Sequence, residues 1–345
     1  MSEKIIFVGS FLSKKKGTQS VAEKISDFLS KHYEVTLVSH KENQLFRLLD
    51  IIFTLCFKKY DIAHIDVFSG KAFVISEVAS WIVKKRDKKI IITLHGGRLN
   101  EFYEKNEKRF EKVFSRANKV LSPSQFLIQS FKKASVHVEY LPNFIDIQRF
   151  EYSNIKDRSL SLLWVRAFTN VYHPELAVET LKVLKDSFPN LVLNMIGPDK
   201  GTLKKVQSLV KELDLVDSVN FLGKVPNEKL GAYYQSHSVY LNTTRYESFG
   251  IAVVEAAACG IPIVSSLVGE IPYLWKDKEE VLICEDRDAK DMAARVQEIL
   301  NSDELAKSLG KNARKKAEDL DWKMIEKRWL SVVNDVLMKE KTDVV

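Results

Sequence analysis

Residues 244–262 read Thr-Arg-Tyr-Glu-Ser-Phe-Gly-Ile-Ala-Val-Val-Glu-Ala-Ala-Ala-Cys-Gly-Ile-Pro. The small apolar residues predict a tightly packed helix, since Gly260 suits the left-handed position after a last turn and Pro262 cannot continue a helix. Two carboxylates, Glu247 and Glu255, are eight positions apart, so in a continuous helix their directions differ by only about 80°. The stretch therefore predicts a ligand site. The start of such a helix suits a phosphate or a sugar hydroxyl.

The length and composition of the chain favour a two-domain globular protein. Its 345 residues exceed what one hydrophobic core usually organises. With 45% hydrophobic and 29% charged residues, it is neither disordered nor fibrous. Cys56, Cys259 and Cys284 are far apart in apolar contexts, which is typical of buried side chains and not of a disulfide framework or metal site. The first apolar run is too short for a signal peptide, so we expect a cytoplasmic protein.

Positive charge is concentrated in the first half of the chain. Residues 1–150 contain 26 Lys and Arg against 16 Asp and Glu, and the remainder contains 27 against 30. The densest runs are 14–16 and 84–89. They indicate either solvated loops and helix ends, or attraction to anionic lipid headgroups or a phosphorylated acceptor. Nucleic acid is not expected as a partner, because no recognised binding module accompanies the charge.

Predicted strands and helices alternate through both halves of the chain, which is the pattern of an α/β protein. A polar stretch at 151–159 has the character of an interdomain linker. We therefore expect two Rossmann-like parallel-sheet domains facing across a cleft, one at 1–150 and one at 151–324. A C-terminal helix at about 325–345 could pack back on the first domain.

His95-Gly96-Gly97 directly follows a predicted strand at 89–94. Ligands of open parallel sheets bind at the carboxyl ends of strands, and glycines permit close approach to a ligand. His95 is therefore a candidate for binding or catalysis, the alternative being a structural histidine. His64 has no such context and is expected to be structural.

Residues 45–57 predict a strongly apolar helix that is interrupted by Arg47 and Asp50. It is too short to span a bilayer, which takes about 20 residues. We expect it to face the core, with contact in the plane of a membrane as the alternative.

The Glu-x7-Glu pattern, within Glu-Ser-Phe-Gly-Ile and Gly-Ile-Pro-Ile-Val, resembles the signature of glycosyltransferase family four, also called group 1 glycosyl transferases. These are retaining enzymes with the GT-B fold. The resemblance covers nearly the whole chain. Further residues in the family's order and approximate spacing are Gly17, His95, Gly96, Ser122, Leu141, Pro142, Asn143, Asp146, Arg166, Gly197, Phe221, Leu222, Gly223, Asp321 and Trp322.

The resemblance implies that a nucleotide-diphosphate sugar binds between the domains, mainly on the second, while the acceptor binds on the first. Three residues would be catalytic: His95, Arg166 and Glu247. The donor-binding residues would be Gly17 in the first loop, Arg166 on the diphosphate, Gly223 near the base, Glu247 with the backbone of Phe249, Gly250 and Ile251 on the sugar and phosphate, and Glu255 on the ribose.

The mechanism that the resemblance implies has no protein nucleophile, and the departing diphosphate acts as base for the acceptor hydroxyl. This chain departs from the family at Val171, where a lysine usually provides a second cation for the diphosphate. Our hypothesis is that His173, Lys16 or Arg98 replaces it.

No metal or other cofactor is expected. Asp286-Arg287-Asp288 matches the Asp-x-Asp metal motif of the other large glycosyltransferase fold. The same pattern recurs by chance at 319–321, and Asp288 suits a helix N-cap.

The expected function is transfer of a hexose-type sugar to a glycan or lipid-linked acceptor in the assembly of surface polysaccharide, lipopolysaccharide or glycolipid. The basic first half would contact the inner face of an anionic membrane. Two alternatives stay open: a non-catalytic GT-B module that binds a nucleotide or glycan, and a GT-B sugar-nucleotide epimerase. A hydrolase with paired carboxylates is disfavoured, because no second catalytic pair is visible.

Overall fold

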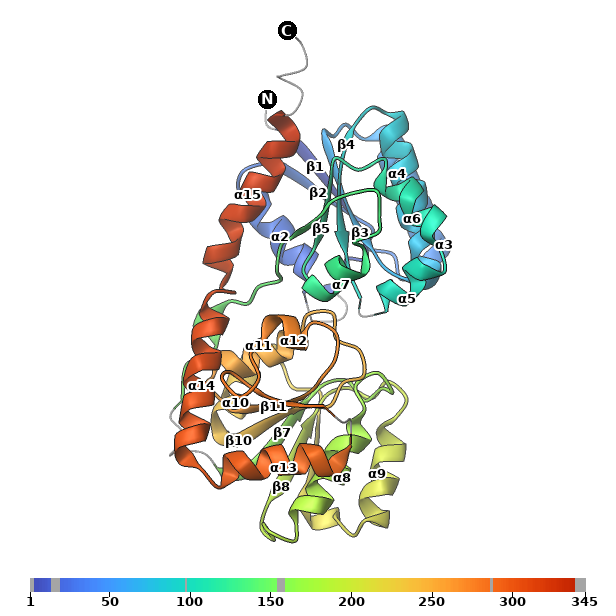
Figure 1. The fold of residues 1–345 in the computed structure, drawn as a ribbon. Helices are drawn as coiled ribbons and strands as arrows, with labels where there is room; N and C mark the ends of the chain where they lie inside the picture. Colours follow the sequence, from blue (N-terminus) through green and yellow to red (C-terminus); the bar gives the residue numbers. More distant parts are fainter. Residues whose placement is uncertain (1–2, 14–18, 97, 154–158, 286–287, 339–345) are drawn as a thin grey trace. The chain divides into compact units, whose positions relative to one another are not determined.

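The structure, a computed structural model, describes residues 3–13, 19–96, 98–153, 159–285 and 288–338. The chain forms two compact units: unit 1 is Met1–Phe144 with Lys323–Val345, and unit 2 is Ile145–Trp322 (Figure 1). The sequence places the division after residue 150. It falls earlier because the Ile145 N–H donates to the carbonyl of Leu320 at 3.0 Å, which attaches this segment to unit 2.

Unit 1 contains a sheet of six parallel strands in the order β2-β1-β3-β4-β5-β6. The strands are β1 (Lys4–Val8), β2 (Glu34–Val38), β3 (Ile62–Val67), β4 (Lys89–Leu94), β5 (Lys119–Ser122) and β6 (Val138–Tyr140). The helices are α2 (Val21–Leu29), α3 (Gln44–Phe57), α4 (Phe73–Lys85), α5 (Leu99–Glu104), α6 (Glu107–Phe114), α7 (Gln125–Ser130) and α15 (Trp322–Met338), with a 3₁₀ turn η1 at Gly70–Ala72.

Helices cover both faces of the unit 1 sheet. α3, α4 and α6 lie on one face, and α2 and α15 lie on the other (Figure 1). α15 is fixed there because the Tyr33 hydroxyl donates to Asn334 at 2.9 Å and the Trp329 ring meets His64 edge-on at 5.5 Å. The last helix of the described residues, α15, is thus part of the core of the first unit.

Unit 2 contains a second sheet of six parallel strands in the order β12-β11-β10-β7-β8-β9. The strands are β7 (Ser159–Val165), β8 (Val192–Ile196), β9 (Val219–Gly223), β10 (His237–Asn242), β11 (Ile263–Ser266) and β12 (Leu282–Cys284). The helices are α8 (Pro174–Leu184), α9 (Leu203–Glu212), α10 (Asn227–Ser236), α11 (Ile251–Ala258), α12 (Ile271–Leu274), α13 (Ala289–Leu300) and α14 (Asp303–Glu318), with 3₁₀ turns η2 at Ile147–Arg149 and η4 at Val216–Ser218. The two expected parallel sheets are confirmed.

The helix predicted from residues 244–262 is α11. It begins after Gly250, whose φ is +92°, and is followed by Gly260, whose φ is +70°. Both angles lie in the left-handed region that glycine adopts without strain. Apart from Ile251 and Glu255, every residue of the helix is buried. Glu255, one of the two predicted carboxylates, therefore lies on the partly exposed side of the helix.

The structure corrects one helix of the first half of the chain and confirms the core contact expected of another. The composition of residues 101–116 is that of one charged helix, but the chain forms two helices, α5 and α6, which are separated at Asn106, whose side-chain amide donates to the Phe102 carbonyl. Asparagine competes with helical hydrogen bonding in this way. α3 does face the core through Ile51 and Leu55, but its opposite side is exposed and apolar. Within the described residues no helix is long and apolar enough to cross a membrane.

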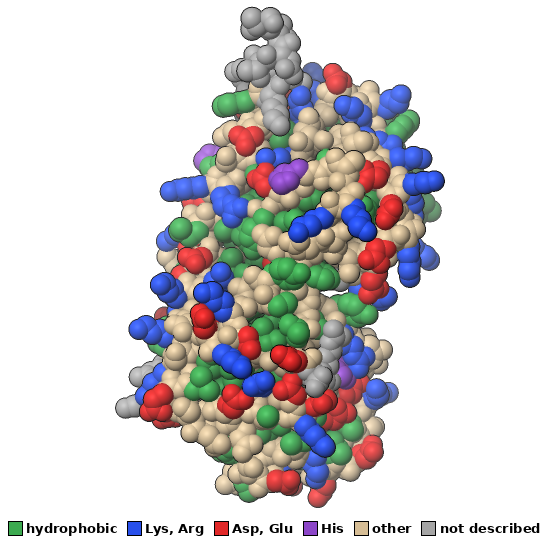
Figure 2. All heavy atoms as spheres, viewed as in Figure 1, with side chains coloured by type: hydrophobic (Ala, Val, Ile, Leu, Met, Phe, Trp, Pro, Cys, Tyr) green, Lys and Arg blue, Asp and Glu red, His purple; other side chains and the backbone are tan. Residues whose placement is uncertain are grey.

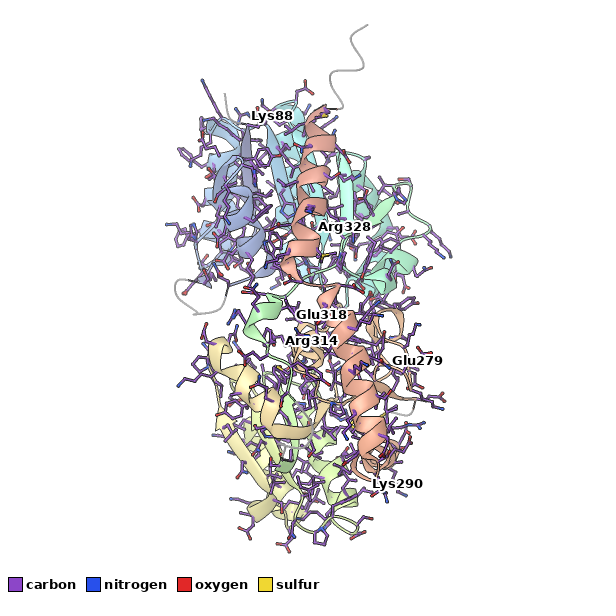
Figure 3. All side chains as sticks on the ribbon, turned by 90° about the vertical axis from the view of Figure 1, so that its left-hand side faces the viewer. Lys88, Glu279, Lys290, Arg314, Glu318 and Arg328 are labelled. Atoms are coloured by element: carbon purple, nitrogen blue, oxygen red, sulfur yellow. The ribbon has the colours of Figure 1, made fainter. Side chains whose placement is uncertain are left out.

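The segment that leads into unit 2 is held by α14. Arg314 donates to the carbonyl of Phe150 at 2.6 Å and forms an ion pair at 2.8 Å with Glu318, one turn along the same helix (Figure 3). Arg314 thereby connects the first segment of unit 2 to α14, the helix that precedes the return of the chain to unit 1.

Buried His64 is expected to make unit 1 sensitive to acid. Burial lowers its pKa to about 4, although nearby Asp66 opposes the shift. As pH falls, the unfolded state therefore binds the proton before the folded state does. The contribution of His64 to the free energy of unfolding is complete above about pH 6.5 and is lost as pH falls toward 4, by about 3 kcal/mol at most. Urea titrations at pH 7 and pH 4.5 measure this difference. His64→Gln is expected to reduce it, and exposed His137→Gln is not; equal losses in both variants would contradict the assignment.

Candidate active site

The candidate site in unit 2 lies where parallel strands end. β7 and β10 are neighbours in the sheet, and Arg166 directly follows the last residue of β7. The Arg166 Nη2 is 3.4 Å from the side-chain oxygen of Asn242, the last residue of β10. The loop after β10 contains Glu247 and leads into α11. Arg166 and Glu247, which are 81 positions apart in the chain, thus meet at the carboxyl edge, where open α/β sheets bind ligands.

Arg166 and Glu247 form a buried ion pair, with Nη2 2.7 Å from Oε2. The Tyr172 ring lies 5.3 Å from the guanidinium carbon and adds a cation–π contact. Burial disfavours the charge on Arg166, but Tyr240 and Glu247 outweigh it, so its pKa lies above the usual value. The guanidinium therefore stays charged, and it is held in place by a carboxylate and a ring.

Two buried tyrosines connect this pair to Glu255. The Tyr234 hydroxyl donates to Glu255 Oε2 at 3.4 Å, and its ring lies 5.7 Å from that of Tyr240. Burial raises the pKa of Tyr240 to about 12, so both hydroxyls remain neutral donors near pH 7. Among the described residues, Arg166 Nε and Tyr240 Oη are buried without a hydrogen-bond partner. Each of these two groups is therefore able to form a hydrogen bond with a bound ligand.

Two glycines fix the backbone of the charged pair. A Cβ on Gly269 would lie 1.8 Å from the carbonyl oxygen of Glu247, and one on Gly197 would lie 1.7 Å from that of Arg166. The next residue, Glu270, donates its N–H to the same Glu247 carbonyl at 3.1 Å. Close backbone packing therefore fixes the backbone positions of Arg166 and Glu247.

The other donor-binding residues that were predicted in unit 2 lie at the same edge of its sheet. The Gly197 N–H donates to the carbonyl of Gly223, which places both glycines at the ends of neighbouring strands. The Phe249 N–H donates to Glu247 Oε1 at 3.4 Å, so the turn before α11 orients the carboxylate. His173 is the N-cap of α8, with φ +46°, one residue after Tyr172.

Val171, where a lysine was expected, is bonded to the same loop as Glu247. Its carbonyl accepts from the Arg245 N–H at 2.8 Å and from the Thr244 hydroxyl at 3.2 Å. The backbone of Arg245 therefore lies beside the lysine position, and its side chain is exposed. The sequence reasoning missed this arginine, although it stands only two residues before Glu247.

In unit 1, His95 follows β4 and is oriented by Asp66 of β3. Its Nε2 is 3.0 Å from Asp66 Oδ1, and its ring stacks on Phe68 at 5.3 Å. Burial would raise the pKa of Asp66, but the charge and hydrogen bond of His95, with a smaller contribution from His64, hold it below the usual value. The Asp66 carboxylate thus fixes the orientation of the His95 ring through Nε2, and the other ring nitrogen, Nδ1, points away from Asp66. Asp66 has no motif around it and was not predicted.

Several predicted positions lie outside the described residues: Gly17 and Lys16 in the first loop, and Asp286 and Arg287 of the acidic motif. Asp288 is described and caps α13 by accepting from the N–H groups of Lys290 and Asp291. The N-cap prediction is confirmed. Arg98 belongs to unit 1, where it pairs with Glu101 at 3.3 Å.

Comparison with known proteins gives this arrangement a family. Residues 146–316, which include the Arg166–Glu247 pair and both carboxylates of the motif, match the model of "Glycosyl transferases group 1". The chain belongs to the group 1 glycosyl transferases. It is 25% identical over 302 residues to an N-acetyl-alpha-D-glucosaminyl L-malate synthase of Bacillus anthracis, covering 81% of this chain and 76% of that protein.

Solved glycosyltransferases share the fold of this group 1 member. Sucrose-phosphate synthase of Thermosynechococcus elongatus has a TM-score of 0.78 at 17% identity, covering 98% of this chain and all of that one. Anabaena HepE in complex with UDP and glucose has a TM-score of 0.75 at 16% identity, covering 96% of this chain and all of that one. The fold is GT-B, as the resemblance implied.

Proposed function

We propose that this glycosyltransferase moves a hexose-type sugar, with retention, from a nucleotide-diphosphate donor to a glycan or lipid-linked acceptor in the assembly of surface polysaccharide, lipopolysaccharide or glycolipid. One observation carries the proposal: the buried Arg166–Glu247 pair at the start of α11, with Glu255 farther along the same helix. Arginine offers paired donors to phosphate oxygens, and carboxylates accept from vicinal hydroxyls.

In the proposed reaction the leaving diphosphate gains negative charge as the bond to the sugar breaks. Arg166 and the positive N-terminal end of the α11 dipole stabilise that charge. Glu247 then binds the sugar hydroxyls, and Glu255, reached by the Tyr234 hydroxyl, binds the ribose. The diphosphate takes the proton of the acceptor hydroxyl on the same face. No metal has a role in this proposal, so activity is expected to survive chelation by EDTA.

For the second phosphate cation we propose Arg245, with His173 as the alternative. Both belong to loops joined at Val171, the position of the missing lysine. His173 is constrained by its place at the N-cap of α8, whereas Arg245 is exposed. An unchanged donor KM in both Arg245→Ala and His173→Ala would exclude the two residues together.

The acceptor is proposed to bind unit 1. A pocket of about 270 Å³ is lined by Ser69, Gly70, Arg98, Glu101, Phe102 and Lys105, from the segments that follow β3 and β4. Two cations and a carboxylate suit a hydroxylated or phosphorylated acceptor. A lipid-linked acceptor would require the protein to meet an anionic membrane surface, for which the positive charge of the first half is suited.

The proposal is tested by thermal denaturation with UDP-, GDP- and ADP-sugars. A ligand that binds only the folded state raises the melting temperature with its occupancy. We expect one class of donor to give a shift, and the complex of HepE with UDP makes UDP-sugars the first to test. Release of free nucleotide diphosphate from a labelled donor then distinguishes a transferase from a binding module. No shift with any donor would contradict the proposal.

Asp66 is proposed as a positioning residue for His95. Asp66→Asn keeps the shape of the side chain but removes the charge that fixes the imidazole. We expect kcat to fall about 10- to 100-fold, as for other carboxylates that orient a functional histidine. Donor affinity in the thermal assay is expected to stay unchanged, which a general loss of structure would not allow. Asp87→Asn, in an exposed turn of the same unit, is the control. Equal kcat in the two variants would exclude the role.

A further inference from the structure

The outer side of α3 is an apolar surface that the fold leaves in water. Five large side chains have more than half of their surface exposed, and we call them the α3 stripe: Leu45 (63%), Phe46 (62%), Leu49 (52%), Phe53 (65%) and Phe57 (73%). They recur at helical spacing, and the rings of Phe53 and Phe57 lie 4.8 Å apart. Arg47 and Asp50 are only partly exposed, so apolar groups dominate the outer side.

The stripe is exposed although the helix itself is firmly placed. On the inner side, Ile51 and Leu55 are completely buried. Asn43 caps the first turn by accepting from the Leu45 N–H at 2.9 Å. At the other end Arg86 donates to the carbonyls of Leu55 and Lys58 at 2.6 and 2.8 Å. The fold therefore holds α3 in place with its outer apolar side exposed, and an exposed apolar patch of this kind marks an interaction surface.

Positive charge borders the stripe at the end of α3. Lys58 and Lys59 follow the helix directly and are exposed. The Arg86 hydrogen bonds bring the end of α4 to the same place, and that end contributes exposed Lys84 and Lys85. Figure 2 shows several Lys and Arg side chains along the right-hand edge of unit 1, in the region of α4 and α6 in Figure 1.

The adjoining helix adds an aromatic side chain of the kind found at membrane interfaces. Trp81 of α4 is 52% exposed. Large exposed apolar patches mark interaction surfaces, and the combination of Phe and Leu with bordering lysines fits an anionic lipid surface. Tryptophan is enriched at the level of lipid headgroups. Charge complementarity therefore favours lipid over a protein partner for this surface.

We propose that the α3 stripe, with Lys58, Lys59, Lys84 and Lys85, docks unit 1 on an anionic lipid bilayer, α3 lying in the plane of the interface. The inference rests on the proposed lipid-linked acceptor, for which it names the surface that brings enzyme and membrane together. The phenyl and leucyl side chains enter the boundary between headgroups and acyl chains, and the lysines contact the headgroups.

The test is flotation of the full-length protein with vesicles of phosphatidylglycerol and phosphatidylcholine, or of phosphatidylcholine alone. Phe53→Ser/Phe57→Ser is expected to weaken binding to the anionic vesicles at least about tenfold. Lys58→Glu/Lys59→Glu is expected to weaken it about fivefold for each lysine. The matched controls are Val216→Ser, which removes an equally exposed apolar residue of unit 2, and Lys132→Glu/Lys133→Glu, an exposed pair elsewhere in unit 1. Neither control is expected to change binding.

Cys56 provides a second readout that does not depend on folding of a variant. The prediction that all three cysteines are buried is wrong for Cys56, which is exposed between Phe53 and Phe57 on the outer side of α3, whereas Cys259 and Cys284 are buried. An environment-sensitive fluorophore on Cys56 is expected to shift to shorter wavelength with anionic vesicles only. An unchanged emission together with equal flotation of the stripe variant and wild type would overturn the proposal. A concentration-dependent dimer that protects Cys56 without lipid would overturn it as well, by assigning the stripe to a second copy.

Donor binding on the same preparations separates this inference from the proposed function. Thermal stabilisation by a nucleotide sugar with no vesicle binding would overturn lipid docking and leave the transferase proposal standing. Vesicle binding through the stripe without stabilisation by any donor would support docking and contradict the transferase proposal.

Discussion

Replacing Arg166 with lysine is expected to lower kcat for sugar transfer by about 10²- to 10³-fold, the usual cost of removing one preorganised donor from a developing negative charge. Lysine retains the positive charge opposite Glu247, so the buried carboxylate is not left without an ion-pair partner. It loses the planar fork and the stacking on Tyr172, which lies 5.3 Å from the guanidinium. The measurement is single-turnover release of nucleotide diphosphate from labelled donor.

Arg166→Ala would be harder to interpret. Removing one partner of a buried ion pair leaves the other without compensation and costs about 3–5 kcal/mol of stability. Arg295→Lys is the matched control, because Arg295 pairs with Asp291 and Glu298 on the surface of the same unit. Its kcat is expected to equal that of the wild type. An Arg166→Lys enzyme that is equally active would remove the guanidinium from the mechanism.

The placement of the candidate site residues around α11 was largely predictable, because these residues are close together in the sequence. Glu247, Gly250, Glu255 and Gly260 occupy one loop and one helix, so helical spacing and glycine geometry place them without knowledge of the remaining chain. Arg166 lies far away in sequence, and only its resemblance to a family arginine connected it to Glu247. The structure confirms that the two side chains meet, at 2.7 Å.

The residues that sequence reasoning missed depend on strand order. Asp66 reaches His95 because β3 and β4 are neighbours, with Asp66 opposite Thr93. Arg245 reaches the lysine position through a hydrogen bond to Val171 across two loops. Local patterns contain no information on which strands pair, so these contacts had no signal in the chain.

The orientation of α3 was unpredictable for a related reason. The helix is apolar on both its inner and its outer side, so periodicity does not distinguish the side that packs from the side that stays exposed. Only the fold shows that Ile51 and Leu55 are buried while Phe53 and Phe57 are not. The predicted core contact is confirmed by Ile51 and Leu55, and membrane contact through the exposed side stays a proposal.

Gly269→Ala is expected to abolish most activity and to lower the free energy of unfolding by at least about 2 kcal/mol. The new Cβ would lie 1.8 Å from the Glu247 carbonyl oxygen, and the φ of Gly269 is +50°. Either the loop after β11 or the Glu247 backbone has to move. Because the same carbonyl accepts from the Glu270 N–H, movement also breaks a hydrogen bond and displaces the carboxylate from Arg166.

Gly201→Ala separates this clash from backbone strain. Gly201 has φ +110°, so an added methyl group strains its backbone too, but nothing lies within 4 Å of the new Cβ. We expect a stability loss of about 1–3 kcal/mol from strain alone, with kcat unchanged. Chemical denaturation and kcat are measured on both variants. Backbone strain is expected to lower the stability of both, whereas only Gly269→Ala, whose new Cβ meets the Glu247 carbonyl, is expected to lose turnover. A folded Gly269→Ala enzyme with wild-type kcat would contradict this prediction. It would mean that the Glu247 backbone can shift, and the 2.7 Å ion pair with Arg166 can change, without any effect on the reaction.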